Sequence, residues 1–565
     1  MRLLESIRRD WIFSELRKVK GPIGLSVGAS VLASVLQILI SLFVMAVYNK
    51  VIPNEALTSL VTLAFGVLVL ILFDWGFKYV RSRLVDEAAQ TVEIPLQRKL
   101  FAKVLSWDLQ ARPRFSGSMT TLVRDIESIV ELFTSSSVST LVGLPFVFIN
   151  LLVIWAIAGP LVFVTAGVCL VTLVISVFYF MRVSGLADEA KARSIDKNSV
   201  FLESVSNLET LKSIGDYDYF EAKWDRTETL SRDVEKRLKL ALADSTSLNA
   251  TVSSAGQVLL VAAGAYLVIE GVTTTGALIA SVMLNGRTNQ PIAQLAGLLQ
   301  KMSTARTSLE RLTGVFEMVS SEEARRKNIR VRRVEPPIVI DKLTSQPPGT
   351  NAPILSVDRL RLVPGQHVGI VGSVGSGKST LLKLIGGILT PTTGSVSYGS
   401  FDTSAIHQTD LRRDVAYLGQ VPGIFGGSIR ENVSLSNPLI DDESLLDVLS
   451  VTGLDKVLKR LPNGISFEMS ENGRELSGGQ KQILALTRAI ASDPSVLLLD
   501  EPTSAMDPTH EHQFIAHMGQ FIKGRTLIVV THRKPILNLT TRMLVIESGR
   551  IVMDGPTDDV MAKFK

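Results

Sequence analysis

Residues 372–380 read GSVGSGKST, a glycine-rich stretch that ends in lysine, serine and threonine. The apolar run HVGIVG leads into it and predicts a buried strand, and LLKLIGGIL after it predicts a helix. A glycine-rich turn at a helix N-terminus presents backbone N–H groups to phosphate. Lys378 can reach the β and γ phosphates of a nucleotide, and the Ser379 hydroxyl can ligate magnesium. The stretch therefore predicts a nucleotide-phosphate site.

Composition sets the outer bounds of the fold. A chain of 565 residues is too long for one hydrophobic core, so two or more domains are expected. Hydrophobic residues make up 46% of the chain, and their excess lies ahead of residue 300. The formal net charge of +5 is spread over both halves, so no nucleic-acid partner is expected. Cys169 is the only cysteine, which excludes an intramolecular disulfide and a cysteine-based metal site.

Uncharged apolar runs in the first part of the chain predict six membrane spans. Three runs, over residues 21–49, 56–73 and 245–269, each fit one crossing. The run over residues 132–181 is twice as long, and the pair Gly159–Pro160 divides it into two helices joined by a tight turn. A sixth span begins near Gly271. The sequence thus predicts a polytopic α-helical membrane domain.

The charges between the spans predict their orientation, because Lys and Arg gather in cytoplasmic segments. Basic residues are frequent in the leader 1–20 and in the segments 74–131 and 182–244. The alternate connections are short. We therefore expect both termini on the cytoplasmic side of a bacterial inner membrane, with the long loops continuing the membrane helices into the cytosol. A cleaved signal peptide is the alternative for the first 45 residues, but the apolar run is too long for it.

Three features of these segments have two interpretations each. SWDLQARPRFSGSM (106–119) and SIGDYDYFEAKW (213–224) contain helix breakers. We interpret both as bends that dock on another domain, with ordinary solvated connections as the alternative. Arg287 is the one charge well inside the sixth span. Snorkelling of Arg287 to the cytoplasmic surface is favoured over contact with a substrate.

A soluble α/β pattern follows from about residue 336, after a polar linker. HVGIVG, SVLLLDE and TLIVVTH predict buried strands. SVLLLDE ends in Asp500 and Glu501, so one carboxylate can ligate magnesium and the next can activate an attacking water. The sequence LSGGQ lies at residues 476–480 of the same domain. His510, His512 and His517 are assigned to a solvated helix and not to a metal site.

These motifs resemble the ATP-binding cassette (ABC) family over nearly the whole chain. The phosphate loop, LSGGQ, the acidic strand end, TSAMD at residues 503–507 and the strand-end His532 occur in the family's order. The resemblance implies that Glu501 is the general base, that His532 positions the γ phosphate and that Gln420 senses magnesium. It also implies that LSGGQ caps an ATP held by the opposite subunit, and that Glu471 belongs to the loop linking this site to the membrane part.

The expected site and domains follow from the pattern and the resemblance together. The expected catalytic residues are Glu501, His532 and Lys378, and the expected Mg²⁺ ligands are Ser379, Gln420 and Asp500. The residues expected to bind ATP are Gly372, Ser373, Val374, Gly375, Ser376, Gly377, Lys378, Ser379, Thr380, Gln420, Ser477, Gly478, Gly479 and Gln480. The expected domains are a cytoplasmic leader (1–20), a membrane domain with six spans and two long loops (21–315), a linker (316–335) and an α/β P-loop NTPase domain (336–565).

The sequence departs from the family pattern in the segment that is expected to contact the adenine base. Family members place an aromatic residue about 25 residues ahead of the phosphate loop to stack on adenine. Here the segment is LTSQPPGTNAP, with Pro347 near that place, and no aromatic residue occurs from Lys342 to Pro364. We expect weaker selection of adenine over guanine, with ATP as the nucleotide.

The membrane half is similar to the type I secretion ATPases within this family. The similar segments are VYNKVIPNEALTSL, FSGSMTTLVRDIESIVELFTSS, GLPFVFINLLVIWAIAGP and LNGRTNQPIAQLAGLL. The resemblance implies ATP-driven export of an unfolded polypeptide, often of the RTX type, together with a membrane fusion protein and an outer-membrane channel. About 20 residues precede the first span, so no N-terminal peptidase domain is expected.

This chain contains every motif of the ATP site, so two copies of it could form two complete sites. A homodimer embedded in membrane lipid is therefore the simplest assembly, with a heterodimer as the alternative. The nearest alternative function is an exporter or flippase of lipid, drug or glycan with the same architecture. A nontransporting cassette ATPase is disfavoured by the six spans. A membrane anchor or sensor with idle nucleotide sites is disfavoured by the intact Glu501.

Overall fold

The computed structural model describes residues 10–109, 121–318, 329–347, 349–350 and 352–563. The chain forms two compact units, residues 1–104 with 113–317 and residues 105–112 with 318–565. We call the first the helical unit and the second the α/β unit.

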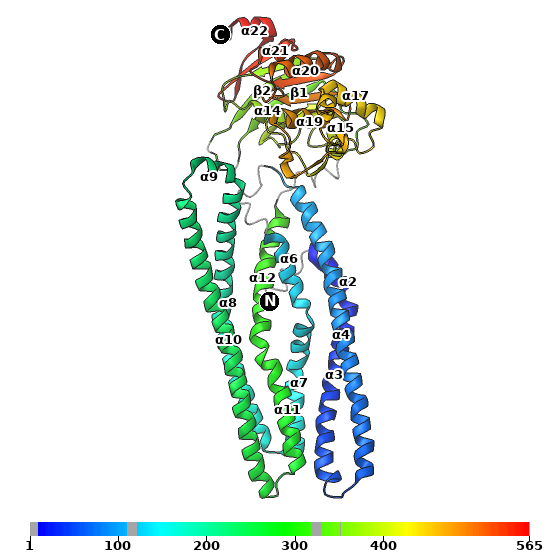
Figure 1. Cartoon of the computed structure of the whole chain (residues 1–565), viewed down its shortest axis with the longest axis vertical. Helices are drawn as coiled ribbons and strands as arrows, with labels where there is room; N and C mark the ends of the chain where they lie inside the picture. The colour runs from blue at the N-terminus through cyan, green and yellow to red at the C-terminus, as the bar shows by residue number, and fades with distance from the viewer. Residues whose placement is uncertain (1–9, 110–120, 319–328, 348, 351, 564–565) are drawn as a thin grey trace. The chain divides into compact units, whose positions relative to one another are not determined.

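Helices make up the helical unit (Figure 1). In chain order they are α2 (Asp10–Lys18), α3 (Lys20–Ala46), the π-helical turn η1 (Val47–Val51), α4 (Leu57–Leu105), α6 (Thr121–Val130), the 3₁₀ turn η2 (Glu131–Phe133), α7 (Ser135–Ala158), α8 (Leu161–Ser206), α9 (Leu208–Ile214), α10 (Asp218–Ile269), α11 (Thr275–Ala293) and α12 (Leu295–Glu317). The longest of them are α4, α8 and α10.

Short connections at residues 52–56, 159–160 and 270–274 join these helices at one end of the unit, which we call the short-turn end (Figure 1). Gly159 has a φ of 54°, a left-handed conformation that glycine adopts without strain, and Pro160 precedes the first turn of α8. The tight turn predicted at this pair is confirmed. Thr274 caps α11, because its side chain accepts a hydrogen bond from the Ala277 N–H.

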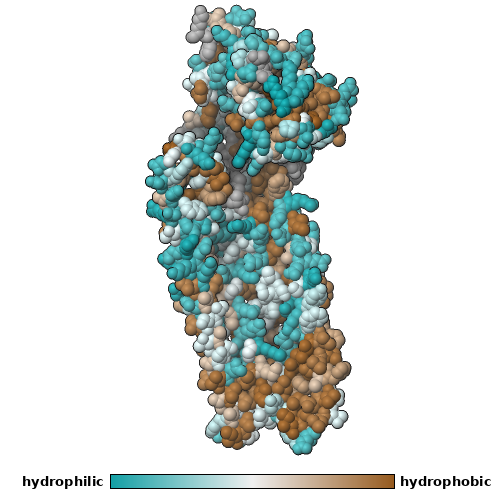
Figure 2. Space-filling view, viewed as in Figure 1, coloured by the Kyte–Doolittle hydropathy of each residue, from teal (hydrophilic) through white to brown (hydrophobic). Residues whose placement is uncertain are grey.

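On the face shown in Figure 2, apolar side chains gather at the short-turn end, and hydrophilic side chains predominate on the helical extensions beyond it. Among the described residues, five helices are long and apolar enough to cross a membrane: Lys20–Val51, Leu57–Leu105, Ser135–Ala158, Leu161–Ser206 and Asp218–Ile269. The predicted sixth span is α11, which is more polar because it packs against α3, α7, α8 and α10 and turns Asn285, Thr288 and Asn289 inward. A helix surrounded by others needs no apolar outer face.

The long loops predicted between the spans are largely helical. Helices α4, α8 and α10 extend far from the short-turn end, and α8 and α10 lie side by side (Figure 1). Gly215 ends α9 with a φ of 74°, so a bend lies where SIGDYDYFEAKW predicted one. Most of SWDLQARPRFSGSM lies outside the described residues.

Arg287 does not snorkel, and that interpretation is wrong. Its guanidinium donates to the main-chain carbonyl of Gln37 on α3. The side chain therefore turns into the helical unit and joins α11 to α3. A backbone carbonyl partner is one of the ways in which a cation inside a membrane segment is compensated.

The described part of the leader forms α2, which packs on other helices of the helical unit. Ile12 and Val19 are buried, and the Trp11 ring stacks on Phe316 of α12 with 4.3 Å between the ring centroids. The nearly buried Glu15 carboxylate lies 2.7 Å from the ammonium nitrogens of both Lys18 and Lys99. Salt bridges and stacking thus tie α2 to α4 and α12.

A buried carboxylate joins three further helices. Asp125 of α6 is fully buried, and its Oδ1 lies 2.9 Å from Lys191 Nζ on α8 and 2.6 Å from an Arg311 nitrogen on α12. Ser308 Oγ donates to the same oxygen at 2.9 Å. Because a buried charge needs compensation, Asp125 fixes α6 against both partners.

The α/β unit contains a six-stranded sheet in the order β12-β11-β3-β10-β9-β6, in which only β12 is antiparallel. A four-stranded antiparallel sheet has the order β2-β1-β4-β5, and β7 pairs with β8. The strands are β1 (Ile338–Ser345), β2 (Leu355–Leu362), β3 (His367–Val371), β4 (Thr393–Tyr398), β5 (Phe401–Asp402), β6 (Val415–Leu418), β7 (Gly427–Ser428), β8 (Glu468–Met469), β9 (Val496–Asp500), β10 (Thr526–Val530), β11 (Arg542–Glu547) and β12 (Arg550–Pro556).

Helices cover these strands. They are α14 (Lys378–Ile385), α15 (Gln408–Asp414), α16 (Ile429–Ser434), α17 (Asp442–Thr452), α18 (Leu454–Leu458), the short turns η3 (Gly464–Ser466) and η4 (Glu471–Gly473), α19 (Gly478–Ile490), α20 (Pro508–Phe521), α21 (Lys534–Leu537) and α22 (Thr557–Lys563). All residues of β9 and β10 are buried, as expected for parallel strands covered on both faces. The three strands predicted from HVGIVG, SVLLLDE and TLIVVTH are confirmed as β3, β9 and β10.

Part of the segment predicted as a linker packs on the α/β unit. The Val331 N–H donates to Asp410 Oδ2 at 3.0 Å, and the Val334 N–H donates to Asp414 Oδ2 at 2.7 Å. Ordered structure in this unit therefore begins ahead of residue 336. The acceptors are carboxylates of α15. The pattern of residues in the segment itself therefore gave no indication of this packing.

Candidate nucleotide site

The phosphate loop leaves β3 at Gly372 and enters α14 at Lys378. Gly372 has a φ of 153°, and a Cβ there would lie 2.0 Å from the Ile546 carbonyl oxygen. Gly377, with a φ of 99°, precedes α14 as its N-cap residue. Glycine is required at both positions because the backbone is in a left-handed region or in close contact. The first N–H groups of α14 thus lie at the loop, where they can bind an anion.

Lys378 lies across the mouth of this loop. Its Nζ donates to the carbonyl oxygens of Gly372 at 2.7 Å and Ser373 at 2.8 Å. Desolvation lowers the pKa of the Lys378 ammonium, and the charges of Glu501 and Asp500 oppose that shift. The opposing effect of the two carboxylates indicates that the lysine and the acidic strand end share one electrostatic environment.

The rest of the loop has the donors that an anion requires. Ser376 is buried, and its Oγ has no hydrogen-bond partner within the described part of the chain. Val374 is 99% exposed at the tip, with Ser373 and Gly375 exposed beside it, and Ser379 and Thr380 are half-buried in the first turn of α14. An unpaired buried hydroxyl is costly unless a ligand satisfies it, so the loop fits a phosphate group.

The remaining candidate residues follow the carboxyl ends of neighbouring parallel strands. Asp500 ends β9, Glu501 follows it, His532 follows β10 by two residues and Gln420 follows β6 by two residues. The order β3-β10-β9-β6 therefore brings these residues and Lys378 to one edge of the sheet. Asp500 is buried, whereas His532 and Gln420 are exposed. Ligands of open α/β sheets bind at this edge.

Glu501 is held in place by its backbone and its side chain. It has a φ of 48°, and its N–H donates to the Val530 carbonyl oxygen at 2.8 Å. Thr531 Oγ1 donates to Glu501 Oε2 at 3.2 Å. A non-glycine residue in this region is strained and is often found at functional sites. Thr531 was not predicted, and its place between a buried strand and His532 is the only sequence signal for it.

LSGGQ begins α19 through a capping box. The Gln480 N–H donates to Ser477 Oγ at 3.3 Å, and the Ser477 N–H donates to Gln480 Oε1 at 2.8 Å. A Cβ on Gly479 would lie 2.8 Å from the Ala505 carbonyl oxygen, while Gly478 is exposed. Because α19 packs on β6, α16, α17 and α18 and α14 packs on β9 and β10, the phosphate loop and LSGGQ of one chain lead into helices with different neighbours.

Gln482, also unpredicted, ties α19 to the loop after Glu501. Its buried Nε2 donates to the Glu501 carbonyl oxygen at 2.6 Å and to Ser504 Oγ at 3.2 Å. Its Oε1 accepts from the Ala505 N–H at 2.9 Å. The signal in the sequence is a polar residue on the mostly apolar buried face of α19, where Thr487 is the other buried polar residue.

The connection from β1 to β2 adjoins the phosphate loop. The Ile354 carbonyl oxygen would lie 3.2 Å from a Cβ on Gly377, and the Ile354 side chain is 38% exposed. The Thr350 N–H donates to the Pro347 carbonyl oxygen at 3.2 Å, which closes a turn at the place where the family pattern has its aromatic residue. The described residues of this connection offer proline and isoleucine surfaces to a base.

Comparison with known proteins assigns the chain to a family. Residues 23–292 match the family model for the ABC transporter transmembrane region, and residues 355–504 match the family model for the ABC transporter. The chain is an ABC transporter. It is therefore a multi-pass membrane protein with a nucleotide-binding ATPase domain coupled to transport.

The relatives of this ABC transporter include toxin-translocation proteins. It is 28% identical over 542 residues to the toxin RTX-I translocation ATP-binding protein of Actinobacillus pleuropneumoniae, covering 94% of this chain and 75% of that one. It is 29% identical over 560 residues to the cyclolysin secretion/processing ATP-binding protein CyaB of Bordetella pertussis, covering 98% and 78%. It is 27% identical over 541 residues to the leukotoxin translocation ATP-binding protein LktB of Mannheimia haemolytica, covering 94% and 75%.

Among solved structures, a bacterial Atm1-family ABC exporter with ATP bound has the same fold. The TM-score is 0.80 at 20% sequence identity, and the match covers 95% of this transporter and 96% of that chain. The exporter fold, with a helical membrane region and an α/β ATPase domain, is thereby confirmed.

Proposed function

We propose that this ABC transporter uses ATP to export an unfolded polypeptide, of the RTX type, as the energising component of a type I secretion system. The observation that carries the proposal is the alignment with the toxin-translocation proteins above, which extends over 94% or more of the chain. The aligned region includes both the helical unit and the α/β unit, so it concerns the transport path as well as the ATPase.

Within the ATP site, each candidate residue has a role that fits its place. Lys378 and the phosphate-loop N–H groups bind the β and γ phosphates, and His532 contacts the γ phosphate. Glu501 accepts a proton from the attacking water. Thr531 orients that carboxylate through its 3.2 Å hydrogen bond.

Ser379, Gln420 and Asp500 are the proposed magnesium ligands. Magnesium in such sites is usually held by one or two carboxylates and the substrate phosphates, so a single buried carboxylate beside a phosphate loop fits this donor set. When bound, magnesium neutralises charge on the phosphates.

Two copies of the chain complete two ATP sites in this proposal. Ser477, Gly478 and Gly479 lie at the start of α19, where the N–H groups of the two glycines and the Ser477 hydroxyl can bind the ATP of the opposite copy together with Gln480. Closure of the two ATPase domains on ATP and their separation after hydrolysis would then move the membrane helices between two arrangements.

We place the transporter in the bacterial inner membrane with both termini in the cytoplasm. The basic residues of the leader and of the two long loops support this orientation. A membrane fusion protein and an outer-membrane channel are the proposed partners that continue the path to the outside.

The test is reconstitution of the transporter with candidate fusion and channel proteins in cells that express a polypeptide with a C-terminal secretion signal. We expect secretion that requires ATP hydrolysis and that the Glu501→Gln variant abolishes. Absence of secretion together with ATP-dependent movement of labelled lipid in vesicles would replace polypeptide export with lipid export.

A further inference from the structure

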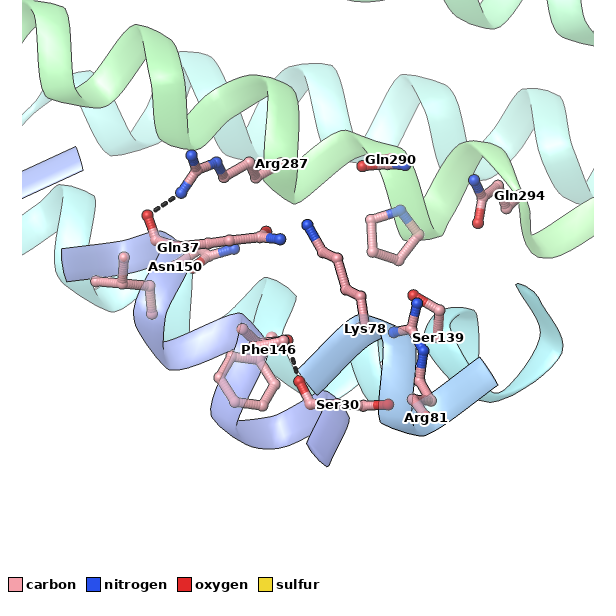
Figure 3. Close-up of a pocket in the computed structure, with 15 residues that line it drawn as sticks. Ser30, Gln37, Lys78, Arg81, Ser139, Phe146, Asn150, Arg287, Gln290 and Gln294 are labelled. Atoms are coloured by element: carbon pink, nitrogen blue, oxygen red, sulfur yellow. Dashed lines mark hydrogen bonds between the residues drawn. The ribbon is translucent and has the colours of Figure 1, made fainter. Parts of the chain in front are cut away.

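A polar cavity of about 230 Å³ lies inside the helical unit, between α3, α4, α7 and α11 (Figure 3). It is lined by Ser30, Ala33, Ser34, Gln37, Ile38, Lys78, Arg81, Ser139, Gly143, Phe146, Asn150, Arg287, Gln290, Pro291 and Gln294. Gly143 allows α7 and α11 to approach here, because a Cβ on it would lie 2.6 Å from Pro291 Cγ.

Three cations line this cavity, and its lining contains no carboxylate. Lys78 Nζ lies 2.6 Å from Asp74 Oδ2, one turn earlier on α4, and Arg81 Nε donates to Ser135 Oγ at 3.2 Å. Arg287 donates to the Gln37 carbonyl oxygen. Within the described residues, Asp74 is thus the only carboxylate that forms a salt bridge with this group, and the hydrogen bonds of Arg81 and Arg287 go to neutral groups.

Amide side chains complete the lining. Gln37, Asn150, Gln290 and Gln294 come from helices on different sides of the cavity, and Figure 3 shows Lys78 extending from α4 toward the space between Gln37 and Gln290. Amides offer both donors and acceptors, as the peptide backbone does. The lining therefore matches a chain that carries negative side chains between peptide groups.

The depth of the cavity strengthens its charge effects. Arg287 lies twelve residues after α11 begins at Thr275, or about 18 Å along the helix from the short-turn end. That distance is well within a hydrocarbon layer of about 30 Å. Cations are costly at such depth, so they usually pair with other groups or mark a substrate path.

We propose that this cavity binds Asp and Glu side chains of the exported polypeptide and thereby selects acidic segments during transport. This inference rests on the proposed function above and specifies its substrate. The volume is below the roughly 300–1,000 Å³ of pockets for drug-sized molecules, so it suits one or two side chains.

A lipid headgroup is the competing anionic ligand. Acyl chains would need an apolar surface that continues from the cationic site, and the apolar side chains of the lining are only Ala33, Ile38, Phe146 and Pro291. Acyl chains cannot form hydrogen bonds with the four amide side chains. Polypeptide carboxylates therefore fit the lining better than a lipid does.

Direct binding to the full-length transporter in phosphatidylcholine nanodiscs tests the proposal. The probe is a short fluorescent peptide rich in Asp and Glu, compared with the same peptide carrying Asn and Gln at those positions. We expect the acidic peptide to bind at least about tenfold more tightly. A single hydrogen bond to a charged group contributes about this factor to a binding affinity. The Lys78→Gln and Arg287→Gln variants should each lose most of that preference.

Matched variants separate charge from folding. Arg83→Gln removes an exposed cation of α4 that does not line the cavity, and it should keep the preference. Arg287→Lys should keep it as well, because it retains the charge. Lys78 is 44% exposed, so Lys78→Gln tests the cavity even where Arg287→Gln impairs folding.

Three results would overturn the inference. They are equal binding of the two peptides by the unaltered transporter, an unchanged preference in both cavity variants, or loss of acidic-peptide binding when phosphatidylglycerol replaces phosphatidylcholine, which would assign the cavity to a lipid headgroup. Polypeptide secretion that continues without preference for acidic segments would remove this inference alone. Absence of any polypeptide secretion would remove the proposed function itself.

Discussion

The two units of this transporter differ in where their apolar side chains lie. In the α/β unit, β9 and β10 are buried along their whole length, and the polar groups of the site follow the ends of such strands. In the helical unit, Phe65, Phe163 and Ile269 are exposed by 70% or more, while serine, threonine and asparagine residues are buried between the helices. Lipid is as apolar as these outer side chains, so the helices gain little from burying them and pack through small and polar residues.

This difference determines where function can be placed. A sheet with an apolar interior confines its chemistry to one edge, whereas a bundle with a polar interior can hold a binding site along its length. The following predictions test that contrast, from the largest expected effect to the smallest.

Glu501→Gln tests whether the sheet edge carries the chemistry. The amide has the size of the carboxylate but cannot accept a proton, so the rate of ATP hydrolysis should fall by about 100-fold or more, with ATP binding retained. Steady-state hydrolysis and labelled-nucleotide binding of the purified protein measure the two effects. Glu547→Gln changes the carboxylate that ends β11 at the same edge, and it should leave hydrolysis nearly unchanged. Near-normal hydrolysis in Glu501→Gln would refute the assigned base.

Asp125→Asn tests whether buried charge stabilises the helical unit. It removes the acceptor charge shared by Lys191 and Arg311 and should lower the free energy of unfolding by about 3 kcal/mol, at the low end for a buried ion pair because both cations are partly exposed. Denaturant unfolding in detergent measures the change. Glu127→Gln, an exposed substitution on the same helix, is the control, and equal stability of the two variants would contradict the role of Asp125.

Gln482→Ala tests a buried polar contact in the α/β unit. The Ala505 N–H and the Glu501 carbonyl would lose a buried partner, so we expect a loss of about 2 kcal/mol in the free energy of unfolding and a lower kcat. Gln513→Ala removes an exposed glutamine and should change neither quantity. An unchanged kcat in a destabilised Gln482→Ala protein would limit this residue to a structural role.

Glu15→Gln should have the smallest effect, and that effect should depend on pH. Hydrogen bonds from Lys18 and then Lys99 lower the pKa of the Glu15 carboxyl below its ordinary value of 4.5. The ion pairs therefore stabilise the fold at neutral pH, by about 1 kcal/mol, and this contribution is lost as pH falls below about 4.5 through the folded-state pKa.

Unfolding of Glu15→Gln and of the unaltered protein as a function of pH measures this difference. The exposed substitution Glu87→Gln on α4 is the control. A difference that does not shrink as the pH falls below about 4.5 would show that packing, and not charge, accounts for the effect.

The same contrast explains what the sequence could predict. Strand-end residues such as Asp500 and Glu501 follow apolar runs along the chain, so the edge at which they meet was visible without a structure. Gln482 was missed because its partners depend on how α19 packs. The cationic cavity was missed because Lys78 and Arg81 lie where basic residues are ordinary for the end of a span, about 200 residues from Arg287. Only the fold brings these charges to one cavity, which α11 and α3 line together with Lys78 and Arg81 of α4.

Pro291 has no N–H to donate to the carbonyl of Arg287, so α11 lacks a backbone hydrogen bond beside the cationic cavity. From there the chain runs through Gln294 into α12, whose last residue, Glu317, ends the helical unit. The missing bond thus lies at a residue that lines the cavity, where a passing side chain would touch the helix. A polypeptide bound in the cavity would restrict the bending of α11 at Pro291. That restriction would extend to α12, because the chain continues directly from α11 into α12.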